Sequence, residues 1–115
     1  MLTEKKILVT GGAGFIGYNI CRYLAENRDY DITIADNFFR GKMDIHLKEL
    51  VEGYSINVLE LDMTLSVSFE RLDKDYDYVY MLASVVGVDY TTSMPNEIIR
   101  INTALIFNTL EWLKG

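Results

Sequence analysis

Four glycines lie within seven residues, in the run GGAGFIG at positions 11–17. The spacing of Gly11, Gly14 and Gly17 has a steric use. The first glycine allows a tight turn, Gly14 lets the backbone approach a pyrophosphate, and Gly17 lets a following helix pack closely. That helix would direct free N–H groups and the positive end of its dipole at the phosphates. With an apolar strand before it and a helix after it, the pattern predicts a dinucleotide-binding turn; the alternative is a purely structural glycine turn.

The second apolar run, 31–36, ends on an acidic residue, Asp36. Asp36 lies 22 positions after Gly14 (36 minus 14), close to the spacing expected of a carboxylate that binds the adenosine ribose. Such a carboxylate accepts hydrogen bonds from both ribose hydroxyls and repels a 2′-phosphate, so we expect NAD as the cofactor rather than NADP. Two cations in the next loop, Arg40 and Lys42, are the competing signal, since they could hold a 2′-phosphate. Without a ligand, Asp36 would be only a surface acid that ends a strand.

The spacing of apolar residues along the chain predicts which strands and helices carry these residues. Strands are expected at 7–9, 31–36, 55–61 and 77–82, and helices at 15–27, 43–51, 66–72 and 95–114. Strands that alternate with helices predict an α/β fold, a Rossmann-like, doubly wound parallel sheet of order 3-2-1-4. The chain is expected to end before a fifth strand. The segment 83–94 is expected to be a loop.

The helices carry apolar residues at helical spacing. We expect one face of the first helix to consist of Ile16, Ile20, Tyr23 and Leu24, and one side of the second to consist of Leu47, Leu50 and Val51. Tyr18 and Cys21 are interpreted as packing residues. The fourth strand is apolar on both faces, so it is expected to be buried, with one edge left unpaired where the fifth strand would follow.

The composition limits the classes of function. The 115 residues suffice for one domain, 1–115, with one hydrophobic core. A net charge of −6 disfavours nucleic acid as a partner. Cys21 is the only cysteine and His46 the only histidine, so neither a disulfide nor a metal site is expected. No signal peptide or long apolar run is present, which favours a cytoplasmic protein without a membrane partner.

The stretch TGGAGFIG resembles the motif of the extended short-chain dehydrogenase/reductases, the NAD-dependent epimerase/dehydratase family, which mostly acts on nucleotide sugars. The run 36–41, DNFFRG, resembles the D-N-x-x-x-G of its decarboxylase and 4-epimerase branches. The resemblance implies that Asn37 lies near the ribose and that Gly41 lets the loop close over the adenosine. Asp62 with Met63 matches the acid that accepts from the adenine amino group; alternatively, Asp62 only begins a turn.

Two further motifs match in part. Leu82, Ala83 and Ser84 resemble H-L-A-[AS], which runs towards the nicotinamide, although Met81 replaces the histidine. Asn102 follows Pro95 as in the family's next helix, where it helps to order the site. The expected cofactor-binding set is Gly11, Gly14, Phe15, Ile16, Gly17, Asp36, Asn37, Gly41, Asp62, Met63, Leu82, Ala83, Ser84 and Asn102.

Catalysis in the family uses a Tyr-x-x-x-Lys pair, and none of the eight tyrosines here has a lysine four residues later. We therefore expect no catalytic residue and no activity in this chain, which resembles the N-terminal part of an enzyme that oxidises a nucleotide-sugar hydroxyl by hydride transfer. The alternative is a non-catalytic dinucleotide-binding module or sensor. The apolar circumference of the helix 95–114, and its place in the family, lead us to expect a homodimer. The alternatives are association through the open edge of the fourth strand, or a monomer in which the helix folds back over that edge.

Overall fold

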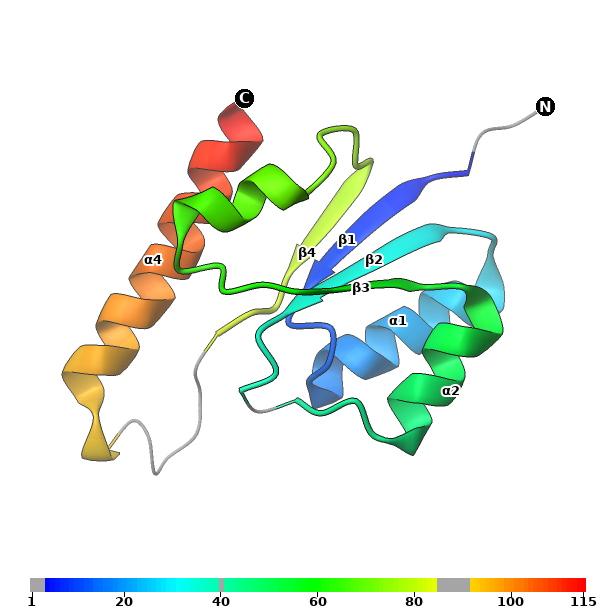
Figure 1. The fold of residues 1–115 in the computed structure, drawn as a ribbon, viewed down its shortest axis with the longest axis horizontal. Helices are drawn as coiled ribbons and strands as arrows, with labels where there is room; N and C mark the ends of the chain where they lie inside the picture. The colour runs from blue at the N-terminus through cyan, green and yellow to red at the C-terminus, as the bar shows by residue number, and fades with distance from the viewer. Residues whose placement is uncertain (1–3, 40, 85–91) are drawn as a thin grey trace. The chain divides into compact units, whose positions relative to one another are not determined.

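The computed structural model describes residues 4–39, 41–84 and 92–115. Figure 1 shows strands alternating with helices along the chain. The elements are β1 (Lys6–Thr10), α1 (Phe15–Asn27), β2 (Asp31–Asp36), α2 (Ile45–Tyr54), β3 (Asn57–Glu60), the 3-10 helix η1 (Ser66–Arg71), β4 (Tyr78–Met81) and α4 (Pro95–Lys114). The bounds of α1, β2 and α4 match the predicted ones. The helix α2 begins later than predicted, because the Asp44 side chain caps it by accepting from the Leu47 N–H at 2.9 Å. It also ends later, at Tyr54, where Ser55 has a left-handed conformation.

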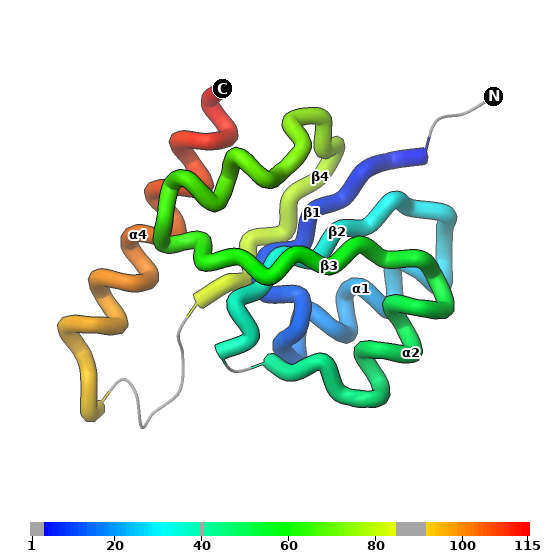
Figure 2. Tube along the Cα trace, viewed as in Figure 1, coloured from blue at the N-terminus to red at the C-terminus, as the bar shows by residue number. Residues whose placement is uncertain are grey.

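The four strands form one parallel sheet of order β3-β2-β1-β4, which confirms the predicted topology. In the centre of the sheet, Ile7 lies beside Ile32 of β2 on one side and beside Tyr78 of β4 on the other. In Figure 2 the chain can be followed from each strand through a helical segment to the next strand, and paired strands run parallel. The carboxyl ends of the strands therefore share one edge, where ligands of such sheets bind.

The chain divides into two compact units. The first consists of Met1–Leu61 with Asp73–Leu82, and the second of Asp62–Leu72 with Ala83–Gly115. The first unit contains the whole sheet, α1 and α2. Its core is made by side chains on one face of β1 and β2, by those of α1 and α2, and by one residue each from the glycine turn and the loop before β3. These are Ile7, Val9, Ala13, Cys21, Ala25, Ile32, Ile34, Leu47, Leu50 and Ile56.

The buried face of α1 differs from the predicted one at Ile16 and Tyr23, whereas the predicted Leu24 does pack against the core. Its buried residues are the small Gly17, Cys21 and Ala25, whereas Ile16 is 63% exposed and Tyr23 is 67% exposed. The glycine turn holds the beginning of α1 so close to the sheet that only small side chains fit between them. Burial raises the pKa of the Cys21 thiol to about 12, which agrees with a packing role for this cysteine.

The strand β4 is not buried as its apolar run predicted. It pairs with β1 and is the edge strand of the sheet, and its Tyr78 and Met81 are 52% and 40% exposed. Apolar sequence on both faces produces burial only where other elements cover both faces, and an edge strand has fewer such neighbours.

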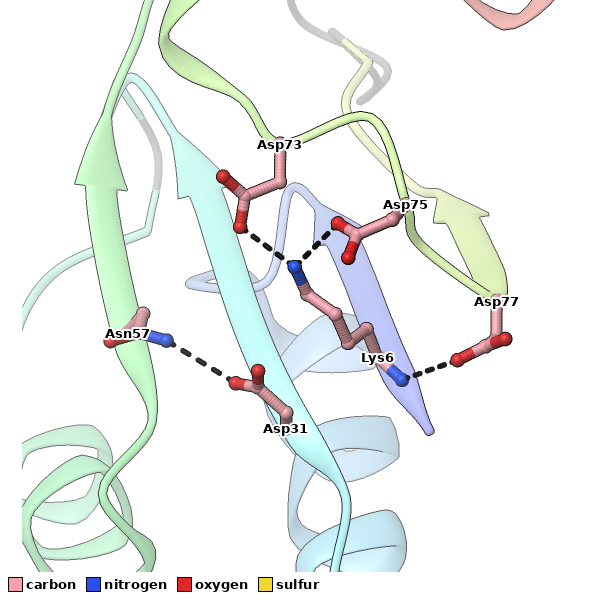
Figure 3. A network of polar contacts seen from close by, with 6 residues as sticks. All are labelled: Lys6, Asp31, Asn57, Asp73, Asp75 and Asp77. Carbon is pink, nitrogen blue, oxygen red and sulfur yellow. Dashed lines mark hydrogen bonds and ion pairs between the residues drawn. The ribbon is translucent and has the colours of Figure 1, made fainter. Parts of the chain in front are cut away.

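At the amino end of β1, one lysine joins the segment that leads into β4. The Lys6 ammonium lies 2.8 Å from an Asp73 oxygen and 2.6 Å from an Asp75 oxygen, as Figure 3 shows. The Lys6 backbone N–H donates to Asp77, and the Asp77 N–H donates to the Lys6 carbonyl at 2.7 Å. Hydrogen bonds to Asp73 and Asp75 raise the pKa of Lys6, and the bond from Lys6 lowers the pKa of Asp75.

The second unit is organised by α4. The rings of Phe69, from η1, and Trp112 pack with their centroids 5.6 Å apart. Met63, Phe69 and Thr109 are buried, and the Thr109 hydroxyl donates to the Leu105 carbonyl at 2.8 Å. These contacts attach η1 and the turn that precedes it to the C-terminal half of α4.

Candidate dinucleotide-binding site

The glycine turn connects β1 to α1 as the sequence predicts. Gly11 has a φ of 74°, a conformation that side chains disfavour, and its N–H donates to the Ala35 carbonyl at 2.8 Å. The Gly14 N–H donates to the Gly11 carbonyl at 3.1 Å and closes the turn. The turn is thus fixed to the end of β2, the strand that carries Asp36.

Two glycines of the turn lack a side chain for different reasons. A Cβ on Gly17 would lie 2.4 Å from the Gly11 oxygen and 2.6 Å from the Gly12 Cα, so the fold itself excludes one. A Cβ on Gly14 would meet no atom closer than 3.5 Å, and its φ and ψ of −79° and 176° suit any residue. Folding therefore requires glycine at 17 and leaves space beside 14.

The beginning of α1 offers backbone donors. Gly14 is the N-cap residue and no side chain caps the helix; the Tyr18 N–H donates to the Gly14 carbonyl at 2.8 Å as the first helical bond. By contrast, Asp44 caps α2. An uncapped helix N-terminus after a glycine turn presents N–H groups and a positive dipole end, which suits a phosphate.

Asp36 is 8% exposed and joins the turn to the following loop. Its carboxylate accepts from the Ala13 N–H at 3.0 Å through one oxygen and from the Phe38 N–H at 2.7 Å through the other. A carboxylate has about four acceptor sites, so two remain for a ligand. The negative charge thus lies directly against the glycine turn.

The loop after β2 folds back onto this turn. Asn37 is exposed and accepts from the Phe39 N–H at 2.9 Å, and Phe38 has a φ of 59°. A Cβ on Gly41 would lie 2.4 Å from the Ala13 oxygen, so Gly41 permits close contact between loop and turn. Arg40 lies outside the described residues, and Lys42 is exposed.

In the second unit, Asp62 begins a turn. The Leu65 N–H donates to the Asp62 carbonyl at 3.1 Å, and Oδ1 of Asp62 accepts from the Thr64 N–H at 3.0 Å and from the Thr64 hydroxyl at 2.6 Å. The structural alternative for this residue is therefore realised. It does not conflict with binding, because Oδ2 of the exposed Asp62 has no partner within the described ranges.

Phe15 and Ile16 are exposed at the beginning of α1, and the remaining predicted residues lie after β4 and on α4. The Leu82 N–H donates to the Thr10 carbonyl and hydroxyl at 3.0 and 3.2 Å, which extends the ladder from β1. Ala83 is half-buried and Ser84 exposed, while Asn102 is half-buried on α4. A hydrogen bond and a close backbone contact thus connect Asp36 and Gly41 with the glycine turn in the first unit. The second unit contains Asp62, Met63, Ala83, Ser84 and Asn102.

Sequence reasoning missed three residues that hold this arrangement. Ala13, among the glycines, donates its N–H to Asp36, and Thr10 binds the residue after β4 through its hydroxyl. Asn108 on α4 donates to two carbonyls of the turn that begins at Asp62. Each of these hydrogen bonds involves at least one backbone group, and no pattern of side chains in the sequence indicates such a partner.

The described part of the chain contains no group of three or more His, Cys, Asp or Glu side chains that could hold a metal ion. None of its helices is both long and apolar enough to cross a membrane. His46 is exposed on α2.

A parallel sheet of order 3-2-1-4, with a glycine turn after its first strand and an acid after its second, defines the class of dinucleotide-binding α/β domains. The chain belongs to the NAD dependent epimerase/dehydratase family, whose model matches residues 7–115. This confirms the resemblance found in the sequence, and the NAD dependence of the family agrees with the predicted cofactor.

Individual relatives are nucleotide-sugar enzymes. The chain is 35% identical over 99 residues to a UDP-N-acetyl-alpha-D-glucosaminuronate decarboxylase of Bacillus cytotoxicus, a match that covers 86% of this chain and 30% of the relative. It resembles Thermus thermophilus UDP-glucose 4-epimerase in complex with NAD, with 28% identity and a TM-score of 0.78 over 93% of this chain and 33% of that one. For the Bordetella bronchiseptica enzyme WbmF in complex with NAD+, the identity is 25% and the TM-score 0.84, over 99% and 33% of the two chains. The chain thus spans about a third of the length of these relatives.

Proposed function

We propose that this chain binds NAD as the N-terminal, cofactor-binding part of an enzyme that epimerises, dehydrates or decarboxylates a nucleotide sugar. Membership of the NAD dependent epimerase/dehydratase family supports the proposal, as do relatives named as UDP-sugar decarboxylases and epimerases. Such an enzyme uses NAD to take a hydride from a sugar hydroxyl carbon. The present chain supplies the adenosine and pyrophosphate part of the site, and catalytic residues lie elsewhere.

The observation that carries the proposal is the position of the Asp36 carboxylate. It lies against the glycine turn, held by the Ala13 N–H at 3.0 Å, with acceptor sites left over. Ribose hydroxyls of an adenosine whose pyrophosphate lies at the beginning of α1 can donate to these sites. A 2′-phosphate at the same place would meet a negative charge, so the site favours NAD over NADP.

Calorimetric titration of the chain with NAD and NADP tests this function. NAD is expected to bind at least tenfold more tightly, and Asp36→Asn should weaken NAD by about tenfold or more, since a hydrogen bond to a charged group contributes about 1.5–3 kcal/mol. Asp31→Asn is the matched control: it removes the same charge from the same strand at the opposite end, near Asn57 (Figure 3). Equal affinities for the two cofactors in the unmutated chain would contradict the proposal.

A second function is favoured by one observation, the lack of a Tyr-x-x-x-Lys pair among the 115 residues. A dinucleotide-binding module or sensor needs no such pair. The two functions share NAD binding and differ in catalysis. They are separated by the gene: a Tyr-x-x-x-Lys sequence encoded in frame beyond residue 115 supports the enzyme, and a stop codon there supports the module.

A further inference from the structure

The side chain of Asn108 binds the turn between β3 and η1 from α4. Its Nδ2 donates to the Thr64 carbonyl at 2.9 Å and to the Met63 carbonyl at 3.2 Å, and Asn108 is half-buried. Both partners are carbonyl oxygens, so the group between them must be a donor, and the amide NH₂ group has two N–H bonds to donate. An oxygen in its place would face two other oxygens.

These two bonds act on the residues that follow Asp62 directly. Asp62 is held within the turn by Thr64, whose N–H and hydroxyl both donate to Oδ1. The Ser68 hydroxyl donates to the Asp62 carbonyl at 2.7 Å and holds the other end of the same residue. Asn108 fixes the backbone of Met63 and Thr64, and Thr64 fixes the carboxylate. The direction of the free Oδ2 is thus set from α4 through the turn.

We propose that Asn108 is the positioning residue for the Asp62 carboxylate, and that it thereby determines how strongly the site selects an adenine amino group. The inference rests on the proposed function, because it takes NAD as the ligand, and on the expectation from the family resemblance that Asp62 accepts from the adenine amino group. Asn108 itself touches the turn and not the cofactor. Its loss should therefore reduce base discrimination, while the ribose discrimination at Asp36 stays unchanged.

Two ratios measured on the whole chain separate these effects. The first compares NAD with nicotinamide hypoxanthine dinucleotide, in which a ring carbonyl replaces the amino group and would face the carboxylate. The second compares NAD with NADP and reports on Asp36. In the unmutated chain we expect the first ratio to be about ten or more, the loss expected when a hydrogen bond to a charged group is removed. In Asn108→Asp it should fall to about two, with the second ratio unaltered.

Matched variants keep the test decisive. Asn96→Asp makes the same chemical change at an exposed position of the same helix and should leave both ratios as they are. Asn108→Ala removes the donor without adding a charge, and it replaces Asn108→Asp if that variant does not fold by circular dichroism. Selective loss of the first ratio supports the inference.

Three results would overturn it: an unchanged first ratio in a folded Asn108 variant, a parallel collapse of both ratios, or no preference for NAD over the hypoxanthine analogue in the unmutated chain. If the unmutated chain binds NAD in these three cases, the proposed function is not contradicted. Absence of NAD binding to the unmutated chain would overturn the proposed function and this inference together.

Discussion

Gly14 and Gly17 belong to one turn, yet only one of them is required by the fold. A Cβ at 17 overlaps backbone atoms of Gly11 and Gly12, whereas a Cβ at 14 has free space. Space that the protein leaves open at the beginning of a helix is where the proposed pyrophosphate would approach. A pair of alanine substitutions can thus distinguish a glycine kept for packing from one kept for a ligand.

Gly14→Ala should fold normally, with a loss in unfolding free energy of about 1 kcal/mol or less, because it changes only an N-cap residue. It should weaken NAD binding by about tenfold or more, since the methyl group occupies the space of the pyrophosphate. Gly17→Ala should cost about 1–3 kcal/mol of stability, the usual effect of overpacking. Denaturant unfolding and calorimetric titration measure the two effects. A Gly14→Ala chain that binds NAD normally would contradict the role given to Gly14.

Among the elements, β4 depends on a contact that lies far from the candidate site. The Lys6 ammonium of β1 binds Asp73 and Asp75, and the Lys6 backbone binds Asp77 through the carboxylate and the N–H of that residue. The segment entering β4 is therefore fixed at the amino end of the sheet. The Lys6 side chain is 22% exposed, and the two carboxylates are largely exposed. The electrostatic contribution of this cluster should therefore respond to both pH and salt.

The pH dependence has a definite sign. The lowered pKa of Asp75 means that its contribution is complete above the ordinary carboxyl value, about 4, and is lost as the pH falls through the lowered value. The raised pKa of Lys6 means that its contribution is complete below about 10 and is lost as the pH rises through the raised value. Lys6→Met should thus lower the melting temperature at pH near 7 and make less difference in strong acid or high salt. Melting curves with the exposed Lys48→Met as control measure this; an equal loss at every pH would contradict it.

At the scale of the whole molecule, α4 carries an exposed apolar stripe. Ile99, Ile106 and Leu113 recur every seven residues and are 66%, 52% and 50% exposed, and Phe107 and Leu110 lie beside them, 61% and 51% exposed. A helix normally buries such a stripe against another element. The homodimer expected through the helix 95–114 would do so by pairing two copies of α4.

Ile106→Lys should weaken such a dimer by at least tenfold, because burying an isoleucine side chain stabilises by about 1.5–3 kcal/mol in each subunit. Asn96→Lys adds the same charge at an exposed polar position of the helix and should leave the dimer intact. Sedimentation at micromolar concentration measures the mass. A single species at the monomer mass of 13.2 kDa for the unmutated chain would show that the helix does not pair.

The sequence by itself determined the order of the elements and the topology of the sheet. Local patterns are sufficient for this: an apolar run short enough for a strand, four glycines in seven residues, and a proline at the first turn of a long helix. It also singled out Asp36, because the distance from a glycine turn to the end of the next strand is nearly constant in such folds. These features depend on neighbours in the chain or on a fixed repeat.

Only the tertiary structure decided which face of α1 is buried and which residues hold the acids. Periodicity favoured the large Ile16 and Tyr23, but the close approach of α1 to β1 admits only small residues such as Cys21. The two hydrogen bonds from the Asn108 amide group to the turn at Asp62 join residues that are 45 and 44 positions apart in the sequence. Contacts between residues so far apart in the sequence depend on the positions of backbone carbonyls and on how closely the elements pack. Both are defined only once the chain has folded.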